Sequence, residues 1–430
     1  MIESIEQLQR VIESHEQIVL YGGGEVCQAI ILYMEKHGWL DKVDTVVDSY
    51  KEGKLLGFPV VKLSELQCKG KEQFFLVTVV EKWQAGIKGA LEQEGYTGFE
   101  LLSNELCQIL TGRTNRNGKG IYRNKHEMTL LRENGWKAFS FDEAMFSKYR
   151  KLIAGLDENS IDLIARILNR IKRILDEERE AYDFYTEEEK EFIQKCKEQF
   201  HDVIMRFPSA EVFSYRNYFL PINHFESSVF VYKHGFKEIV CPEGLKGKTF
   251  IDAGAFVGDS VLVMEELCPG RIICFEAVES HCTLIRKTLE LNDISNVTVE
   301  QTALGEAKGT IEFQVLSSSS NGVGRKGLEY TDIVKVPLVS LDDYVEEHSV
   351  SDIGLIKSDI EGMEQFLLKG ARKTIEKYRP VLLISMYHNP SDFFEIKPMI
   401  DSWNLGYKFS VYKPLGNNTV VAETLLIAQV

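Results

Sequence analysis

The chain has 430 residues, 44% of them hydrophobic and 27% charged, a composition typical of a soluble globular protein with two or three domains. Its formal net charge of −15 argues against nucleic acid or an anionic membrane surface as a partner held by electrostatic attraction. No apolar run approaches the roughly 18 residues that a membrane span needs, and the charged N-terminal segment lacks the apolar core of a signal peptide. Eight scattered cysteines without a CxxC pair are typical of a reducing compartment, so we expect a cytoplasmic protein.

The first 103 residues predict a small Rossmann-like α/β domain. Short apolar strands alternate with helical stretches, an order that favours a parallel sheet with helices on its faces. The predicted strands are residues 18–21, 45–47, 60–61 and 74–79, and the predicted helices are residues 26–37 and 84–94.

Residues 104–205 predict a helical connector. Apolar residues recur there at helical spacing, as in "IDLIARILNRIKRILDEER", and few strand candidates interrupt them. Asn159 or Ser160 is the expected N-cap of that helix.

Residues 206–430 return to alternating strands and helices, after a candidate hairpin at residues 227–240. The predicted strands are residues 249–251, 272–275, 297–301, 311–315, 333–337, 355–358, 381–386, 407–411 and 423–429. The predicted helices are residues 260–266, 280–291, 362–376 and 392–404. This order predicts a second α/β domain, whose last strand fits an antiparallel edge of an open sheet.

The stretch "FIDAGAFVGDS" is the first candidate for a ligand site in this domain. Asp252 ends a strand, and Gly254 and Gly258 permit a tight turn and a close approach of ligand to backbone. Glu276 ends the next strand, 24 residues later, where an acidic side chain accepts hydrogen bonds from ribose hydroxyls of NAD or S-adenosylmethionine alike. The turn lacks the G-x-G-x-x-G spacing that suits a pyrophosphate, and Asp252 would repel phosphates but suit a cationic methionine end. Charge therefore favours S-adenosylmethionine.

The C-terminal half resembles the FkbM family of methyltransferases in the order and spacing of five blocks: "FIDAGAFVGDS", "CFEA", "LNDISNVTVEQTALG", "VPLVSLDDY" and "IGLIKSDIEGMEQFLLKGA". The resemblance covers roughly residues 210–430. It implies a class I Rossmann-like fold and an S-adenosylmethionine-dependent O-methyltransferase that acts on a hydroxyl of a sugar, glycan precursor or glycosylated metabolite. The cofactor-binding residues that it implies are Asp252, Gly254, Ala255, Gly258, Asp259, Glu276, Ala277, Ala303, Asp359 and Glu361. Ala277 stands where proline is common in the family, a difference expected to alter the turn more than the ribose contact.

Methyl transfer to oxygen requires an aligned acceptor and a group that takes up the hydroxyl proton. His388 follows a predicted strand at the edge where open sheets bind ligands and titrates near neutral pH, so it is the predicted base, with Asp359 as the second candidate. A structural hydrogen bond is the alternative role of His388, and capping of the following helix is that of Glu361. No histidine neighbours Asp359 or Glu361 in the sequence, so we expect no metal site. Segment 317–327 is polar and rich in glycine, a composition that indicates a lid, an acceptor-binding loop or a flexible linker.

A second glycine turn, "IVLYGGGEV", lies in the N-terminal domain. Asp48 ends the next strand, where a dinucleotide-binding fold keeps its ribose acid, but Cys27 occupies the place of the third glycine. The segment "GKLLGFPVVKLSEL" resembles the N-terminal domains of bacterial sugar acyltransferases, which bind UDP-sugars. We expect this domain to recognise the nucleotide or sugar part of an acceptor, with a structural domain that supports a homodimer as the alternative.

Two interpretations of the whole chain remain beside methyl transfer. One is an NAD- or UDP-sugar-binding protein that modifies sugars, with its chemistry in the N-terminal domain. The other is a non-catalytic nucleotide-binding scaffold, against which the set Asp252, Glu276 and Asp359 argues.

Overall fold

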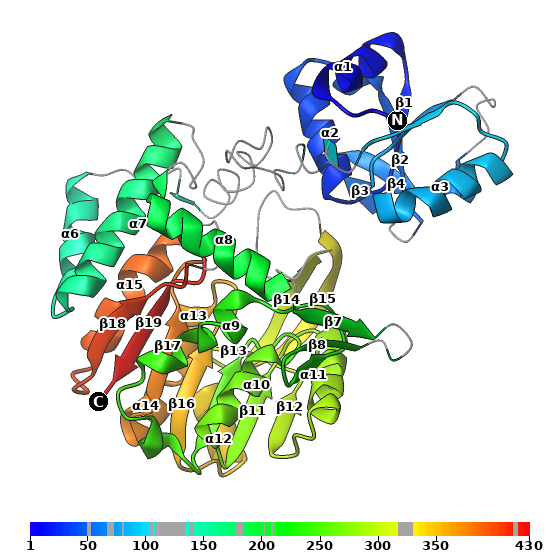
Figure 1. Ribbon diagram of the computed structural model, residues 1–430. Coiled ribbons are helices and arrows are strands. Elements are labelled where there is room, and N and C mark those ends of the chain that lie inside the picture. The colour runs from blue at the N-terminus through cyan, green and yellow to red at the C-terminus, as the bar shows by residue number, and fades with distance from the viewer. Residues whose placement is uncertain are drawn as a thin grey trace. The chain divides into compact units, whose positions relative to one another are not determined.

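The computed structural model of the protein describes residues 1–49, 53–66, 73–79, 81–103, 106–107, 110, 135–136, 142–177, 184–201, 203–207, 210, 212–316, 330–415 and 420–430. The chain divides into two compact units, Met1–Glu127 and Met128–Val430, which are coloured in chain order in Figure 1. None of the helices in the described ranges has the length and apolar character that crossing a bilayer requires. The predicted lid or linker at 317–327 lies outside the described residues.

The N-terminal unit is built on a six-stranded sheet in the order β3-β4-β2-β1-β5-β6. β1 pairs in parallel with β2 and β5, and β3 runs antiparallel to β4 at one edge, so the predicted parallel α/β arrangement is confirmed. The elements are α1 (Ile5–Ser14), β1 (Ile18–Tyr21), α2 (Glu25–Lys36), η1 (Leu40–Lys42), β2 (Val43–Val47), β3 (Gly53–Leu55), β4 (Phe58–Val61), η2 (Leu63–Glu65), β5 (Phe74–Val77), α3 (Glu81–Gln93) and β6 (Phe99–Leu101).

The glycine turn of this unit is closed by Asp48, whose Oδ2 accepts a hydrogen bond from the Gly23 amide at 2.6 Å. Gly22 has φ +118°, and a Cβ there would lie 2.4 Å from Cγ1 of Val79, so the position requires glycine. Cys27 is fully buried in the hydrophobic cluster of the unit. The side chain at the third fingerprint position is therefore part of the packing between α2 and the sheet.

The C-terminal unit contains a seven-stranded sheet in the order β12-β11-β10-β16-β17-β19-β18. Its strands are β10 (Thr249–Ala253), β11 (Arg271–Phe275), β12 (Val297–Glu300), β16 (Ile353–Ser358), β17 (Val381–Ser385), β18 (Lys408–Tyr412) and β19 (Leu425–Gln429). The first five in this order are parallel, and β19 runs antiparallel to β17 and β18. This arrangement confirms the predicted class I Rossmann-like fold. The order reverses at β10 and β16, and open α/β sheets bind ligands in the crevice at such a point.

Further elements surround this sheet, as Figure 1 shows. The helices are α9 (Ser227–Phe230), η6 (Lys233–Glu238), η7 (Pro242–Leu245), α10 (Asp259–Met264), η8 (Glu265–Leu267), α11 (Glu279–Leu291), α12 (Leu341–Glu347), α13 (Glu364–Gly370), α14 (Arg372–Tyr378) and α15 (Pro390–Asp401). Two three-stranded sheets consist of β7 (Ile204–Phe207), β8 (Val212–Tyr215) and β9 (Tyr218–Leu220), and of β13 (Ala303–Gly305), β14 (Gly309–Leu316) and β15 (Tyr330–Ser340).

The described part of the predicted helical connector contains the helices α6 (Glu143–Ile153), α7 (Glu158–Glu177) and α8 (Glu187–His201), which belong to the C-terminal unit. α6 packs against α15, and α7 packs against β18 (Figure 1). The expected N-cap of α7 needs correction, because Asp157 accepts the Ser160 amide at 2.9 Å. The Ser160 hydroxyl is buried and instead accepts the amide of Val411, which ties α7 to β18.

The hairpin predicted at 227–240 is wrong, because this segment forms α9 and η6. Val229, Phe230 and Phe236 are buried in one hydrophobic cluster, so tertiary packing overrides their strand propensity. His234 and Gly235 have φ angles of 48° and 77°, which no strand accommodates. The consequence is that His234 is directed into the protein interior, at 5% exposure.

The turn after β10 provides a prediction about stability. Gly254 has φ +79°, and an alanine Cβ would lie 1.9 Å from the carbonyl oxygen of Asp359, because the two backbone segments nearly touch. Gly258 has φ +80°, but a Cβ at this position would lie 3.4 Å from its nearest neighbour, Cγ2 of Ile285. We expect Gly258→Ala to cost about 1–2 kcal/mol of unfolding free energy for the left-handed backbone alone. Gly254→Ala should cost about 1–3 kcal/mol more. Urea denaturation of both variants tests this, and equal losses would contradict it.

Candidate functional site

A pocket at the carboxyl ends of β10 and β11 contains the predicted ribose acid, and we name it the Glu276 pocket. Phe256, Ala303, Leu304 and Met363 contribute to its largely apolar wall, and Glu276 contributes a carboxylate. The remaining lining residues are Ala253, Gly254, Phe275, Ala277, His281, Thr302, Ile311, Asp359, Ile360 and Glu361. The pocket therefore combines an apolar wall with three acids, of which Glu276 is the one at the end of β11.

Glu276 is held in place by the backbone on either side of it. Its Oε2 accepts the amide of Phe256 at 3.0 Å, and its Oε1 accepts the amide of Val278 at 2.9 Å. Nδ1 of His281 lies 3.4 Å from Oε1. A carboxylate offers about four acceptor positions, so these two amides leave capacity for two further donors.

A second pocket adjoins the first and shares Gly254, Phe256, Asp359 and Glu361 with it. We name it the acidic pocket, because five carboxylates line it: Glu226, Asp259, Asp359, Glu361 and Glu423. His224, Val229, His234, Ser260, Lys357 and Tyr387 complete its wall. The shared residues place Asp359 and Glu361 where the two pockets meet.

Asp252 is fully buried and lines neither pocket. Its Oδ1 lies 3.0 Å from Nζ of Lys357, and its Oδ2 accepts the Ser260 hydroxyl at 2.5 Å. Lys357 also donates to the Gly254 carbonyl at 2.9 Å. Burial alone would lower the pKa of Lys357, but Asp252 and then Asp359 raise it above its ordinary value. The Asp252 charge is thus balanced by Lys357, and its role in this arrangement is to position that lysine and the glycine turn.

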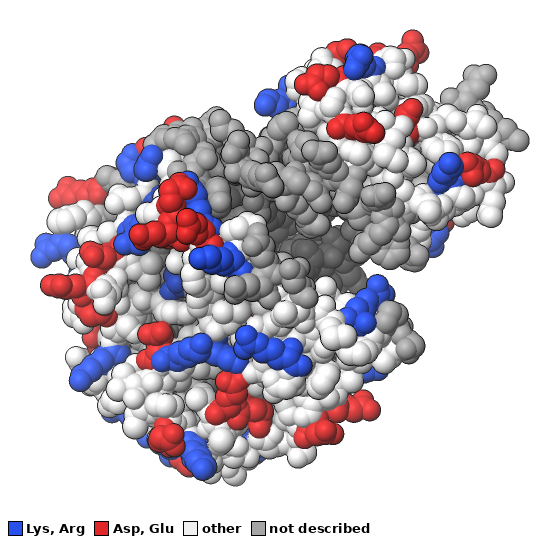
Figure 2. All heavy atoms as spheres, in the orientation of Figure 1, with Lys and Arg blue, Asp and Glu red and all other residues white. Residues whose placement is uncertain are grey.

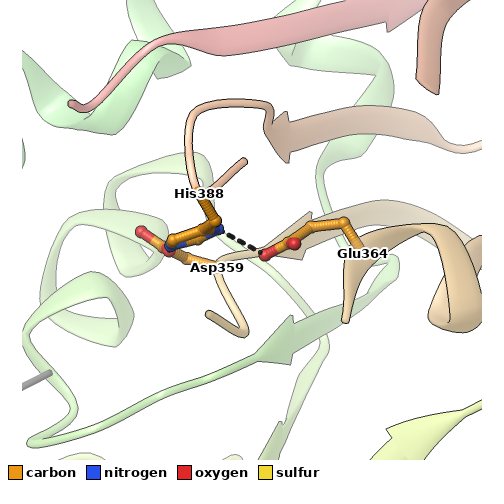
Figure 3. A group of neighbouring side chains, drawn as sticks. All are labelled: Asp359, Glu364 and His388. Carbon is orange, nitrogen blue, oxygen red and sulfur yellow. Dashed lines mark ion pairs between the residues drawn. The ribbon is translucent and has the colours of Figure 1, made fainter. Parts of the chain in front are cut away.

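His388 lies between carboxylates at the end of β17 (Figure 3). Its Nε2 is 3.2 Å from Asp359 Oδ1 and 3.5 Å from Glu361 Oε2, and its Nδ1 is 3.0 Å from Glu364 Oε1. Burial alone would lower the pKa of His388, but the neighbouring carboxylates, Glu364 first, raise it well above its ordinary value. For Asp359 the signs are reversed: burial alone would raise its pKa, but the contact with His388 lowers it below the ordinary range.

This geometry favours a positioning role for His388 over the predicted base. An imidazolium that faces a carboxylate with each ring nitrogen has no lone pair for a hydroxyl proton. His388 is only 6% exposed and lines neither pocket, whereas Asp359 lines both. Tyr387 supports this orientation, because its hydroxyl lies 3.3 Å from both carboxylate oxygens of Asp359.

Asp359, Glu364 and His388 also form a candidate metal group, since one ligand atom of each lies within 4.8 Å of the others. The imidazole ring separates the two carboxylates, so one ion reaches a single ring nitrogen (Figure 3). Both oxygens of Glu364 already accept backbone amides, from Ile360 at 2.8 Å and Gly362 at 3.0 Å. Both amides precede α13, so this contact is not a helix cap, and the three groups form an ion-pair cluster.

The structure brings most of the predicted cofactor residues to the two pockets. Those that line the Glu276 pocket are Gly254, Glu276, Ala277, Ala303, Asp359 and Glu361, and Asp259 lines the acidic pocket. Asp252, Ala255 and Gly258 line neither pocket.

Five further residues of the site were not predicted from the sequence: Glu226, His234, Lys357, Glu364 and Glu423. The sequence does indicate a role for Lys357, because a lysine within the apolar run "IGLIKSD" needs a buried acid as its partner. It indicates none for Glu226 and Glu423, since each lies outside a recognisable motif.

Charged side chains on the visible face of the C-terminal unit are mixed in sign, as Figure 2 shows. The net charge of −15 is therefore not gathered into one surface patch on that face. The acidic pocket gathers five acids, of which Asp259 is buried and Glu226 is exposed.

Comparison with known proteins finds a family match over part of the chain. Residues 252–409 match the family described as Methyltransferase FkbM domain. No curated protein is significantly similar in sequence. Among solved structures, an FkbM methyltransferase from Methylobacillus flagellatus KT is 17% identical, with coverage of 98% of this chain and 92% of that chain and a TM-score of 0.43. A putative methyltransferase from Streptococcus mutans in complex with SAH is 12% identical, covering 44% of this chain and 96% of its own, with a TM-score of 0.27. Aeropyrum pernix fibrillarin with S-adenosyl-L-methionine is 12% identical, with coverages of 46% and 74% and a TM-score of 0.29.

Proposed function

We propose that the protein is an S-adenosylmethionine-dependent O-methyltransferase, since residues 252–409 match the family described as Methyltransferase FkbM domain. The acceptor in this proposal is a hydroxyl of a sugar, glycan precursor or glycosylated metabolite. The observation that carries the proposal is the pair of adjoining pockets at the switch point of the sheet, one with a single ribose-type acid and one with polar groups for an acceptor.

The Glu276 pocket has the chemistry that an adenosine requires. Two acceptor positions of Glu276 suit the two ribose hydroxyls, and the apolar surface of Ala303, Leu304 and Met363 suits a flat base. Bound there, S-adenosylmethionine would supply an electrophilic methyl group carried on a sulfonium. Its methionine end would extend toward Gly254 and Phe256, which both pockets share.

The residues where the pockets meet would orient the acceptor. Asp359 is ionised at neutral pH, is held by His388 and Tyr387, and faces both pockets, so it can accept a hydrogen bond from the acceptor hydroxyl. Alignment of the hydroxyl oxygen with the methyl carbon supplies much of the acceleration in such a transfer. In this proposal His388 is a positioning residue, because it touches Asp359 and not the pockets.

Glu276 provides the test of cofactor binding. Glu276→Ala is expected to weaken binding of S-adenosylhomocysteine by roughly 2–4 kcal/mol, through loss of two hydrogen bonds to a charged acceptor. Isothermal titration calorimetry measures this, and Glu279→Ala, an exposed acid on the next helix, is the matched control. Thermal denaturation separates lost contacts from a loosened turn, since Glu276 also binds two amides. Undiminished affinity in Glu276→Ala would refute the ribose assignment.

For the N-terminal unit we propose recognition of the nucleotide or sugar part of the acceptor. The glycine turn and Asp48 at the end of β2 are the observations that favour it. Titration of the full chain with UDP-sugars and with NAD tests the proposal. Binding of UDP-sugars supports it, binding of NAD with reduction of a sugar points to the alternative chemistry, and binding of neither favours a structural domain.

A further inference from the structure

We propose that the acidic pocket selects an acceptor with an aliphatic ammonium beside the methylated hydroxyl, so that the substrate class is a hydroxylated amine such as an amino sugar. This inference rests on the proposed methyl transfer. Its basis is an excess of acidic side chains together with a buried, unpartnered imidazole in the same pocket.

The negative charge lies on the side of the pocket away from Glu276. Glu226 and Glu423 line the acidic pocket and do not line the Glu276 pocket. Within the described part of the chain, Glu226 contacts the Ser228 hydroxyl at 3.5 Å and Nε2 of His224 at 3.6 Å. Lys357, the lysine of the pocket, is already paired with Asp252. Glu226 therefore has no lysine or arginine partner among the described residues. Glu423 is opposed by the charges of Lys413 and His388, which lower its pKa only in part.

The protonation of these two acids reflects the same excess. The Glu226 side chain is 48% exposed, but partial desolvation in the pocket, then Asp259 and Asp359, raises its pKa to about 7. Burial, then Glu226 and Asp359, raises the pKa of Glu423 to about 8. Mutual repulsion of this kind is relieved when a cation enters between the carboxylates. A ligand ammonium would supply that cation.

His234 is an independent sign of a polar ligand. Neither of its ring nitrogens has a hydrogen-bond partner, although the residue is only 5% exposed and lines the acidic pocket. Burial, and then Lys357, lowers its pKa to about 3, so the ring is neutral and presents one donor and one acceptor. Buried polar groups in folded proteins are normally paired. A hydroxyl donates and accepts, so a hydroxyl-bearing ligand would satisfy this ring.

Two other cations fit the pocket less well. Within the described part of the chain, only Asp359, Glu364 and His388 converge closely enough for a metal ion, and that group includes neither Glu226 nor Glu423. The methionine end of the cofactor carries a sulfonium, an ammonium and a carboxylate, a single net positive charge against five carboxylates. Spread-out acids with a neutral hydrogen-bonding imidazole therefore suit an organic ammonium with neighbouring hydroxyls.

The experiment uses the full chain saturated with S-adenosylhomocysteine. D-glucosamine, N-acetyl-D-glucosamine and D-glucose are titrated as probes, because N-acetylation removes the charge and keeps the hydroxyls. Ligand-observed NMR measures the affinities. Glucosamine should bind about tenfold or more tightly than either neutral sugar.

Variants connect that preference to the two acids. The double variant Glu226→Gln, Glu423→Gln should lose the preference for glucosamine and keep its affinity for S-adenosylhomocysteine within about twofold. Glu243 is exposed, and the control variant Glu243→Gln should keep the preference. Equal binding of charged and neutral sugars by a protein that binds S-adenosylhomocysteine overturns this inference alone. A chain that does not bind S-adenosylhomocysteine overturns the proposed function, and this inference with it.

Discussion

Replacement of Asp359 by asparagine is expected to lower the rate of methyl transfer by about 10²–10⁴-fold. The substitution keeps the size of the side chain and a partner for the Tyr387 hydroxyl but removes the negative charge where the two pockets meet. Affinity for S-adenosylhomocysteine should change by less than about threefold, because that product lacks the sulfonium charge that an anion stabilises. The loss would thus appear in turnover and not in product binding.

Transfer of radiolabelled methyl groups to a panel of neutral and aminated sugars measures this loss, and calorimetry with S-adenosylhomocysteine measures binding. Glu347→Gln is the control for a lost carboxylate, since Glu347 is exposed and pairs with Lys308 at the surface. Turnover at the wild-type level in Asp359→Asn would show that alignment of the acceptor does not depend on this charge.

The central strands of the C-terminal sheet were predictable because buried parallel strands are continuous apolar runs. The expected strands at 249–251, 272–275 and 355–358 correspond to β10, β11 and β16. Acids at the ends of such strands then fall at one edge of the sheet, which is why Glu276 and Asp359 could be placed beside a ligand pocket from local sequence alone.

The side of the site opposite Glu276 could not be predicted in this way. Glu226 and Glu423 belong to segments far apart in the sequence, and both reach the acidic pocket only through the tertiary fold. His234 lies in a segment whose apolar pattern indicates a hairpin, and the left-handed backbone at His234 that redirects it has no propensity signal.

The ion-pair partners of the charged residues could not be predicted from the sequence either. The acidity of Asp252 suggested a role toward a cationic ligand, but the lysine that neutralises it lies on β16, a neighbour of β10 only in the folded sheet. The same holds for His388, which the sequence shows as a single histidine after a strand and the structure shows between Asp359 and Glu364. Electrostatic roles depend on such contacts, whereas strand positions do not.

Replacement of His388 by alanine is expected to lower the free energy of unfolding by about 3–5 kcal/mol, because it leaves buried carboxylates without their shared cation. Glu364 is fully buried, and Asp359 would lose the contact that lowers its pKa. His348→Ala is the control, since that histidine is exposed and its Nδ1 lies 3.1 Å from a backbone carbonyl. Urea denaturation at several pH values measures both variants.

The pH dependence of that loss follows from the two pKa shifts. The pKa of His388 is raised, so its contribution is complete below the unfolded value of about 6.5 and disappears as pH rises through the folded value. The pKa of Asp359 is lowered, so its contribution is complete above about 3.9 and disappears as pH falls through the folded value. The difference between wild type and His388→Ala should therefore be greatest between about pH 4 and 6.5 and shrink in alkali. A difference that instead grows with pH would mean that His388 is neutral in the folded protein, and its Nε2 or Nδ1 would regain the lone pair that a general base requires.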